Sequence, residues 1–319
     1  MLKTKSIESV IQVGDPVAHR GAVVAPLFPR HAPRTPYLTL DEAIPLGFRV
    51  TEVDDAGSVP ELLVTNPLDT AVLAYDGEEL VGAKQDRIVN VTVLVPAESE
   101  TRIPVSCVEQ GRWHSQSAAM SSSEAAAHAT LRRSKAERLS AAPMEAGIAQ
   151  AEVWAEVSAK SARLGTDSPT SAHGDIFRAR ERDLAALRDA FPLQPGQCGA
   201  VLALGADVAV DYVSRPEAFA RLYPKLLNGY LLDAIERLDD EAGTVDGFLE
   251  RLAAAPATQR PSVALGEDVR LRGSGVVGSA LELDGELIQL CGFTSEDRGP
   301  ETRIMRPSGR RRPASDTSD

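Results

Sequence analysis

The sequence predicts an α+β fold, in which an antiparallel β-sandwich-like sheet has two or three helices packed against it. In residues 48–108, short apolar runs alternate with turn sequences such as Asn-Pro and Asp-Gly, a pattern typical of antiparallel strands. In residues 148–238, apolar side chains recur at spacings of three and four, which indicates amphipathic helices. Strand-like runs then return near the C-terminus, so the sheet is expected to draw on both ends of the chain.

The N-terminal segment is punctuated by prolines, which exclude a long helix there. They are Pro16, Pro26, Pro29, Pro33, Pro36 and Pro45. A strand is expected at residues 22–28, which include Pro26. Further strands are expected at residues 62–65, 71–75, 88–95 and 103–108.

The middle of the chain differs in kind. Residues 115–129 form a Ser/Ala tract of low complexity, expected to be a surface loop or a frayed helix. Helices are predicted at 148–164, 176–191 and 216–238, the last with Pro216 in its first turn, where proline is tolerated.

Strands are predicted again at residues 200–204 and 208–213, on either side of a turn at 205–207. A closing hairpin is predicted at residues 279–283 and 286–290. Its turn, Asp284-Gly285, is a strong short-range hairpin signal.

Length and charge bound the organisation. We expect one compact domain at residues 1–297, because the final hairpin lacks enough sequence for a core of its own. Residues 298–319 read as an Arg/Pro/Ser-rich disordered tail. The chain carries −12 and this tail carries +3, so residues 1–297 carry −15. Such an acidic body argues against nucleic-acid binding, although Arg310, Arg311 and Arg312 leave a local contact open.

Several classes of protein are not indicated. No run of roughly 18 apolar residues predicts a membrane span, so the cytoplasm is the expected location. No nucleophile elbow, phosphate loop, HExxH or CxxC pair occurs, so no reaction or cofactor is defined. The five histidines share no metal-ligand spacing, and no metal is predicted. Cys107, Cys198 and Cys291 are expected to be reduced, buried and inert thiols.

Polar side chains concentrate in residues 76–87 and 106–113, at the ends of expected adjacent strands, so Arg87, Glu109, Arg112 and Trp113 are expected to come together. In a functional interpretation, basic side chains bind a phosphate or carboxylate, amides read a ribose or amide edge, and an indole stacks on a planar ring. The candidate ligand-binding residues are Lys84, Gln85, Arg87, Gln110, Arg112 and Trp113, and the candidate bases are Glu79 and Glu109.

A structural interpretation of the same residues stays open. In it, Arg87 and Arg112 pair with Glu79 or Glu109, and Trp113 closes the end of the sheet. The Asp-Gly-Glu sequence at residues 76–78 recurs at 284–286, each time after an apolar run. A hairpin would explain both occurrences, which weakens the inference that the acids at 78 and 79 are catalytic.

The runs at residues 77–87, 104–113 and 278–286 resemble those of a prokaryotic family, the ADP-ribosylglycohydrolase-and-rhodanese-phosphatase-associated proteins, over about residues 15–295. The family is named for its genomic company, which implies a link to NAD and ADP-ribose metabolism. Where such proteins are expected to carry a histidine in the last strand, this chain has Gln289, so the resemblance implies no histidine chemistry from that strand.

Two functions of different classes follow. The first is an enzyme or binding protein for a small nucleotide-derived ligand such as ADP-ribose, with the two arginines on phosphates. The second is a non-catalytic scaffold or partner for an associated enzyme, in which the same residues form a closed polar network.

Overall fold

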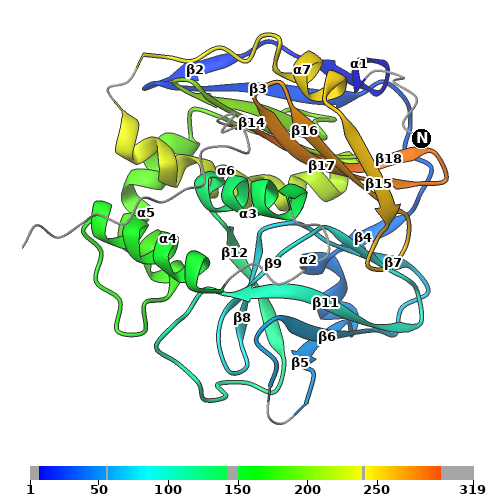
Figure 1. The fold of residues 1–319 in the computed structure, drawn as a ribbon, viewed down its shortest axis with the longest axis vertical. Helices are drawn as coiled ribbons and strands as arrows, with labels where there is room; N and C mark the ends of the chain where they lie inside the picture. The colour runs from blue at the N-terminus through cyan, green and yellow to red at the C-terminus, as the bar shows by residue number, and fades with distance from the viewer. Residues whose placement is uncertain (1–6, 55–56, 142–149, 239–240, 296–319) are drawn as a thin grey trace, which may run out of the picture.

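The computed structural model describes residues 7–54, 57–141, 150–238 and 241–295. One part of the molecule is a large antiparallel sheet, and the other consists of two smaller sheets (Figure 1). Helices α3 (Ala129–Ala141) and α6 (Pro216–Ala234) lie between the two parts and contact both of them. The α+β fold class is therefore confirmed.

The large sheet has nine strands in the order β1-β3-β13-β14-β18-β17-β16-β15, with β2 also paired to β3. Its strands are β1 (Ile11–Val13), β2 (Val17–His19), β3 (Ala22–Pro29), β13 (Gly199–Leu204), β14 (Asp207–Val213), β15 (Ala257–Pro261), β16 (Glu267–Gly273), β17 (Val276–Leu283) and β18 (Glu286–Thr294). The predicted hairpin is confirmed, because Leu283 pairs with Glu286 across Asp284-Gly285. The N-terminal strand at 22–28 joins the returning strands in this one sheet, as expected.

The remaining strands form two separate sheets, ordered β10-β7-β4 and β12-β8-β9-β11-β6-β5. They are β4 (Tyr37–Thr39), β5 (Arg49–Glu52), β6 (Glu61–Asn66), β7 (Ala71–Ala74), β8 (Glu78–Gly82), β9 (Arg87–Val89), β10 (Val93–Val95), β11 (Ser99–Cys107) and β12 (Met120–Ala126). All pairs are antiparallel except β4 with β7. The predicted strand at 88–95 is wrong as one element: it divides between the two sheets at Asn90, whose side chain accepts a hydrogen bond from Ser106.

The Ser/Ala tract is also corrected, because its residues 120–126 form β12 on the edge of the six-stranded sheet. Small side chains there let α6 approach closely. A Cβ added at Gly229 of α6 would lie 3.0 Å from the carbonyl oxygen of Ala127. We infer that packing against α6 stabilises the strand conformation of this tract.

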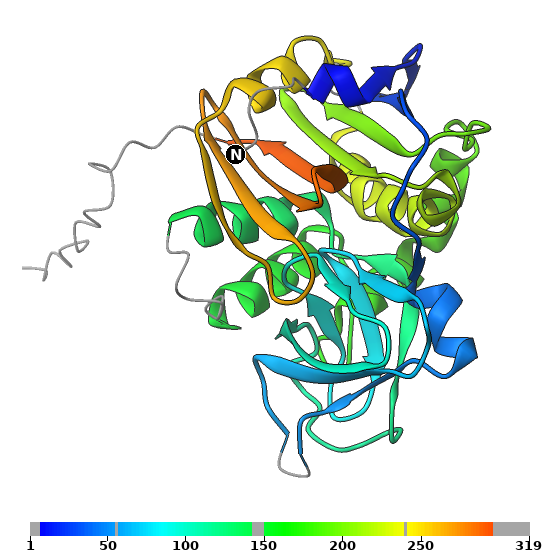
Figure 2. The same cartoon turned by 90° about the vertical axis from the view of Figure 1, so that its right-hand side faces the viewer.

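Three predicted helices are present. They correspond to α4 (Gln150–Arg163), α5 (His173–Arg188) and α6, which continues as the 3-10 turn η2 (Ile235–Arg237). Residues 148 and 149 of the first prediction lie outside the described residues. The short helices α1 (Ile7–Val10), α2 (Leu40–Ala43), η1 (Ile44–Leu46) and α7 (Phe248–Ala254) are also present among the described residues, and α3 was not predicted. Seen from the side, α1 and α7 cover the outer face of the large sheet (Figure 2).

The buried core links the parts of the molecule. One apolar cluster combines Tyr37 and Leu73 of the three-stranded sheet with Leu202 and Phe293 of the large sheet. This shared cluster supports our proposal that residues 1–297 form one domain, whereas residues 298–319 lie outside the described part. Of the described helices, none combines the length and the apolarity required to cross a membrane.

Candidate functional site

The Asp76-Gly77-Glu78-Glu79 turn lies at the centre of the molecule. The hairpin expected there is wrong: β7 pairs with β10 and β4, whereas β8 pairs with β9 and β12, so the turn carries the chain from one sheet to another. All three acids are buried. Each one contacts a different helix, and the turn therefore joins the sheets to the helical layer.

Asp76 reaches α3. Its carboxylate accepts a 2.9 Å hydrogen bond from Lys135 Nζ and lies 3.4 Å from Arg132 Nε. Arg132 also forms a two-fold bridge to Asp211 of β14, with bonds of 2.6 and 2.8 Å. Two tyrosine hydroxyls donate to the same Asp211 carboxylate, Tyr75 at 2.7 Å and Tyr230 at 2.6 Å. Each of these side chains has at least one hydrogen-bond partner within the cluster, which we interpret as a structural anchor.

Glu78 reaches α6. It accepts a 3.1 Å bond from Lys225 Nζ and a 2.8 Å bond from the backbone N–H of Tyr75. Lys225 also donates to Asp41 and to Ser122. Burial raises the pKa of Glu78, although Lys225 opposes this. The residue therefore fixes α6 against the small sheets.

Glu79 reaches α5. Its Oε2 accepts a 3.3 Å bond from Ser123, while its Oε1 lies 3.7 Å from His173 Nδ1. Within the described residues, neither Glu79 Oε1 nor His173 Nδ1 has a hydrogen-bond partner. Of the two candidate bases, Glu79 is thus the one with an unsatisfied oxygen.

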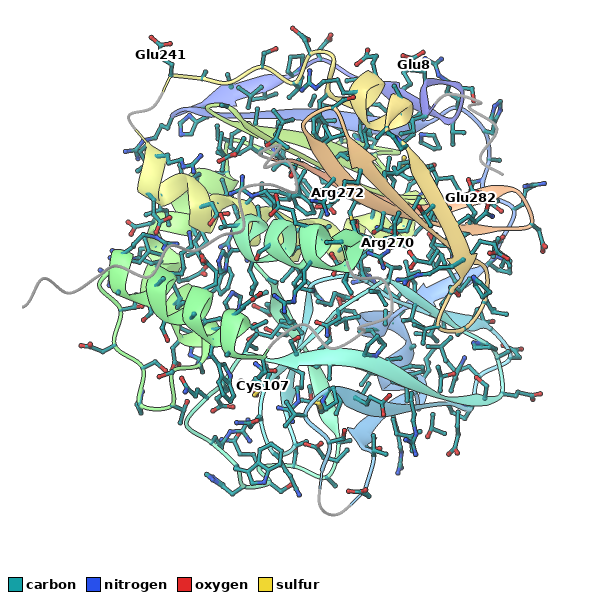
Figure 3. All side chains as sticks on the ribbon, in the orientation of Figure 1. Glu8, Cys107, Glu241, Arg270, Arg272 and Glu282 are labelled. Atoms are coloured by element: carbon teal, nitrogen blue, oxygen red, sulfur yellow. The ribbon has the colours of Figure 1, made fainter. Side chains whose placement is uncertain are left out.

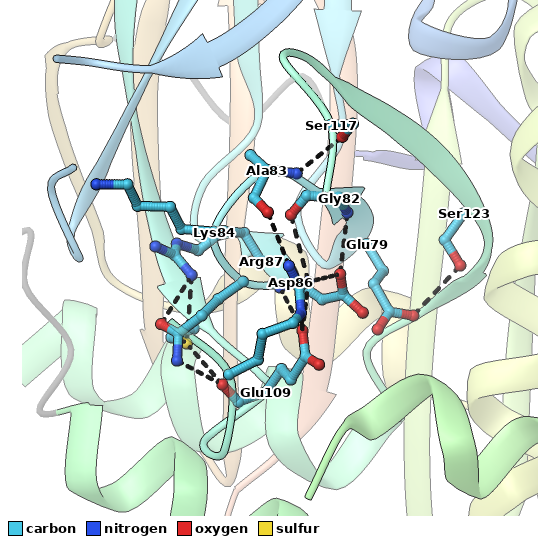
Figure 4. A network of polar contacts seen from close by, with 12 residues as sticks. Glu79, Gly82, Ala83, Lys84, Asp86, Arg87, Glu109, Ser117 and Ser123 are labelled. Atoms are coloured by element: carbon cyan, nitrogen blue, oxygen red, sulfur yellow. Dashed lines mark hydrogen bonds and ion pairs between the residues drawn. The ribbon is translucent and has the colours of Figure 1, made fainter. Parts of the chain in front are cut away.

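Glu109 and Arg112 form a closed bracket at the end of β8, where Figure 4 shows Glu109 close to Ala83 and Asp86. Arg112 Nε donates to Glu109 Oε2 at 2.8 Å, its Nη2 donates to Asp86 at 2.9 Å, and its Nη1 donates to the carbonyl of Ala83 at 2.7 Å. Glu109 Oε2 also accepts the backbone N–H of Asp86. Arg112 is 2% exposed, and its charge is neutralised by Glu109 and Asp86 within the protein.

Electrostatics in the bracket follow from these contacts. Burial alone would raise the pKa of Glu109, but the bonds from Arg112 and Asp86 outweigh it and lower the pKa below its ordinary value. Burial raises the pKa of Asp86 to about 6, even though Gly82 and Arg112 oppose the shift. An anionic Glu109 held by a guanidinium is a poor general base.

Arg87 lies deeper and is less completely paired. It is 0% exposed, and its Nη1 donates to Gln85 Oε1 at 3.2 Å and to Cys107 Sγ at 3.3 Å. Its Nη2 lies 3.9 Å from Glu52 Oε1. Arg87 Nε and Nη2 have no hydrogen-bond partner among the described residues. Gln85 Nε2 donates to the carbonyl of Glu109, which ties Arg87 to the bracket.

The ring of Trp113 lies over this arginine. Trp113 is 49% exposed, with Lys84 Nζ 5.5 Å and Arg87 Cζ 5.8 Å from its ring centroid. Gln110 is exposed. The structure therefore brings Arg87, Glu109, Arg112 and Trp113 together, as predicted.

The three thiols are free and buried, as predicted. Cys107 lies at the end of β11, beside the start of α4 (Figure 3). Burial raises its pKa, although Arg87 opposes the shift. Burial also raises the pKa of Cys198, to about 12, and that of Cys291. The arginine beside Cys107 thus does not make it an activated thiolate.

A pocket of about 40 Å³ opens away from the bracket, between α3, α6 and the large sheet, lined in part by Thr130, Arg133, Asp207 and Tyr230. That volume holds only a few water molecules. No cluster of three or more metal-ligating side chains occurs in the described ranges.

Sequence reasoning missed the buried histidines. His128 Nδ1 lies 3.2 Å from His173 Nε2, and His128 Nε2 lies 3.3 Å from Glu156 Oε1. The two histidines are 45 positions apart, and neither has metal-ligand spacing. Their only sequence signal was the apolar surroundings of residues 125–131 and 172–177.

The fold and the site define a class of α+β protein. Buried ion pairs join its sheets to its helices, and a closed polar bracket lies at one end of a sheet. The chain belongs to the ARG and Rhodanese-Phosphatase-superfamily-associated Protein domain family, whose model matches residues 10–293. No curated protein and no solved structure matches the chain.

Proposed function

We propose that the protein is a non-catalytic binding partner for an enzyme of the ARG or rhodanese-phosphatase type. The observation that carries this proposal is the closure of the bracket: Arg112 and Glu109 satisfy each other and leave neither charge for a substrate. The family description, which names an association with those two kinds of protein, supports the same conclusion.

The bracket also suggests where a partner would bind. Arg112 holds the loop at residues 112–117 against residues 82–86, helped by the bond from Ala83 N–H to Ser117 Oγ. The loop therefore presents Trp113, about half exposed, from a fixed backbone. Exposed tryptophans on ordered surfaces are common hot spots of protein interfaces.

The test uses the purified full-length chain with purified ADP-ribosylglycohydrolase and rhodanese-phosphatase proteins from the same organism. Isothermal titration calorimetry should detect a complex with one of them. Trp113→Ala should weaken it at least tenfold, because truncating an interface hot spot costs about 2 kcal/mol or more. The matched control is Leu193→Ala, an exposed apolar side chain outside this loop. The proposal would be refuted if neither enzyme formed a complex at protein concentrations of about 100 micromolar, roughly 100-fold above a micromolar dissociation constant.

A second candidate is the binding of a nucleotide-derived ligand of NAD or ADP-ribose metabolism. It is favoured by one observation, the two nitrogens of Arg87 that have no hydrogen-bond partner among the described residues and lie beneath the half-exposed ring of Trp113. Each charge-assisted contact to a phosphate contributes roughly 1.5–3 kcal/mol. In this reading Trp113 stacks on the ligand's ring, and Lys84, Gln85 and Gln110 line its edge.

Thermal unfolding with millimolar ADP-ribose or NAD tests the second candidate. A ligand-dependent rise in melting temperature that Arg87→Ala abolishes would support it. The absence of any rise in the wild-type protein would refute it and leave the partner proposal standing.

A further inference from the structure

Four titratable side chains from four separate segments are joined end to end. They are Glu79 of β8, His173 at the start of α5, His128 just before α3, and Glu156 of α4. The successive gaps are 3.7, 3.2 and 3.3 Å. The first three side chains are 0% exposed, and Glu156 is 24% exposed. The proposed function uses none of these contacts.

Protonation is defined at the Glu156 end. Burial alone would raise the pKa of Glu156, but the bonds from His128 and Arg163 outweigh it and lower the pKa. Burial lowers the pKa of His128. Glu156 is therefore a carboxylate and His128 a neutral imidazole. Since a carboxylate only accepts hydrogen bonds, the single proton of His128 is on Nε2 and is donated to Glu156.

This assignment determines the next two contacts. His128 Nδ1 carries no proton and accepts, so His173 Nε2 must donate across the 3.2 Å gap. A neutral His173 then has no proton left for Nδ1. That bare nitrogen faces Glu79 Oε1, which is an acceptor if Glu79 is ionised. Both atoms are buried without a partner among the described residues.

Two bare acceptors facing each other in a dry interior are costly, because neither regains the hydrogen bond that it made to water. One additional proton between Glu79 Oε1 and His173 Nδ1 makes this contact a hydrogen bond once the two atoms close from 3.7 Å to hydrogen-bond distance. Three contacts then hold three protons, whereas two neutral histidines supply two.

We propose that Glu79, His173, His128 and Glu156 share one extra proton, and that this proton makes the attachment of β8 to helices α3, α4 and α5 dependent on pH. The same three protons also satisfy the reverse arrangement, in which Glu156 is protonated, although the lowered pKa of Glu156 makes this the minor form. A concerted shift of one proton across each contact interconverts the two, and no bond is lost. The proton can therefore exchange with solvent through the partly exposed Glu156.

The charged surroundings favour an added proton. The facing groups are Lys160 and Arg163 on α4, Asp233 on α6, Glu236 on η2, Asp86 after β8, and Asp175 and Arg178 on α5. Asp86 pairs with Arg112, and Arg178 pairs with Asp175. The rest comprise Asp233 and Glu236 with the two cations Lys160 and Arg163. Together with Glu79 and Glu156 themselves, these groups carry more negative than positive charge, and an extra proton reduces this excess.

Thermodynamic linkage gives the measurable consequence. In the unfolded chain above about pH 7, histidines are neutral and glutamates are ionised, so the extra proton is absent. The folded state therefore holds one more proton than the unfolded state. Its contribution to stability decreases as pH rises, and the folding equilibrium constant falls about tenfold for each pH unit.

The test is urea denaturation at pH 7, 8 and 9 of the wild type, Glu79→Gln and Glu156→Gln. A glutamine amide at either end donates a hydrogen bond of its own. In either variant, all three contacts between the four side chains are therefore hydrogen bonds when the two histidines carry only their two ordinary protons. The ratio of wild-type to variant folding constants should fall about 100-fold between pH 7 and pH 9. Glu109→Gln is the matched control: its parent carboxylate faces Arg112, not a histidine, so its ratio to wild type should stay constant.

The proposal is overturned if Glu79→Gln and Glu156→Gln both keep the wild-type pH dependence. If one of these variants fails to fold, the other still tests the proposal, because each glutamine removes the need for the extra proton independently. Calorimetric unfolding at pH 8 in buffers of different ionisation enthalpy gives an independent count of protons. The wild type should release about one proton more than Glu156→Gln, and equal release by the two proteins would contradict the shared proton.

Discussion

Arg112→Ala separates a structural arginine from a ligand-binding one. The substitution leaves Glu109, whose side chain is 5% exposed, without its 2.5 Å ion pair, and Asp86 without its 2.9 Å partner. The carbonyls of Ala83 and His114 also lose a donor. Removing one member of a buried ion pair costs about 3–5 kcal/mol. Because Asp86 is partly exposed, we expect a loss of about 3 kcal/mol in the free energy of unfolding.

Urea denaturation followed by circular dichroism measures this loss. The matched control is Arg102→Ala, whose ion pair with Glu61 joins side chains that are 63% and 43% exposed. It should cost only about 0–1 kcal/mol, since solvent screens exposed pairs. Arg112→Lys should recover part of the loss, because lysine restores the charge but not the planar fork. If Arg112→Ala is as stable as Arg102→Ala, the bracket does not hold this loop and the structural reading of Arg112 fails.

Three further outcomes are expected. Because the folded state binds the Asp86 proton more tightly than the unfolded chain, with a pKa of about 6 against 3.8, its contribution to stability should fall as pH rises from about 4 to about 6; urea denaturation of Asp86→Asn should lack this fall. Gly77→Ala, at φ +87° with its new Cβ 2.8 Å from Arg132, should lower the melting temperature more than Gly285→Ala, at φ +72° with open space around it, and equal shifts would contradict the crowding. All three buried cysteines should react with a thiol reagent only after unfolding, and rapid native labelling of Cys107 would show that the region around Arg87 opens.

Local chemistry accounts for what the sequence could predict. The closing hairpin follows from the left-handed backbone that Asp284 and Gly285 adopt, at φ +50° and +72°, which tight hairpin turns require. Helices α5 and α6 follow from apolar residues repeating at helical spacing. The same Asp-Gly signal at residues 76–77 does not mark a hairpin, because β7 and β8 do not pair with each other. A turn sequence indicates that the chain bends, but not which strands pair on either side of it.

Elements that depend on distant partners could not be predicted in this way. Helix α3 buries Arg132 and Lys135 among Leu131, Ala136 and Leu139, so charged side chains interrupt the apolar pattern on its buried face. The acids that make this burial possible, Asp76 and Asp211, lie 56 and 79 positions from Arg132. Strand β12 is selected by α6, whose approach the serines and alanines permit.

The candidate site shows the same division. The ends of adjacent strands predicted that Arg87, Glu109 and Arg112 would meet. Which acid each arginine would take depended on the loop at 82–86, whose positive φ at Ala83 no pattern signals. The histidine pair became visible only when the fold brought residues 128 and 173 within 3.2 Å.

The buried charges around residues 76–79 are better explained by orientation than by stability. Replacing a buried ion pair with packed apolar groups is often neutral or stabilising, whereas mismatched partners are heavily penalised. Asp76, Glu78 and Glu79 each face a basic side chain on a different helix, Lys135 on α3, Lys225 on α6 and His173 on α5. A slip of any helix by one turn would leave a buried acid unpaired. The turn therefore fixes one arrangement of helices and sheets, and a surface held this rigidly can bind a partner without an ordering cost.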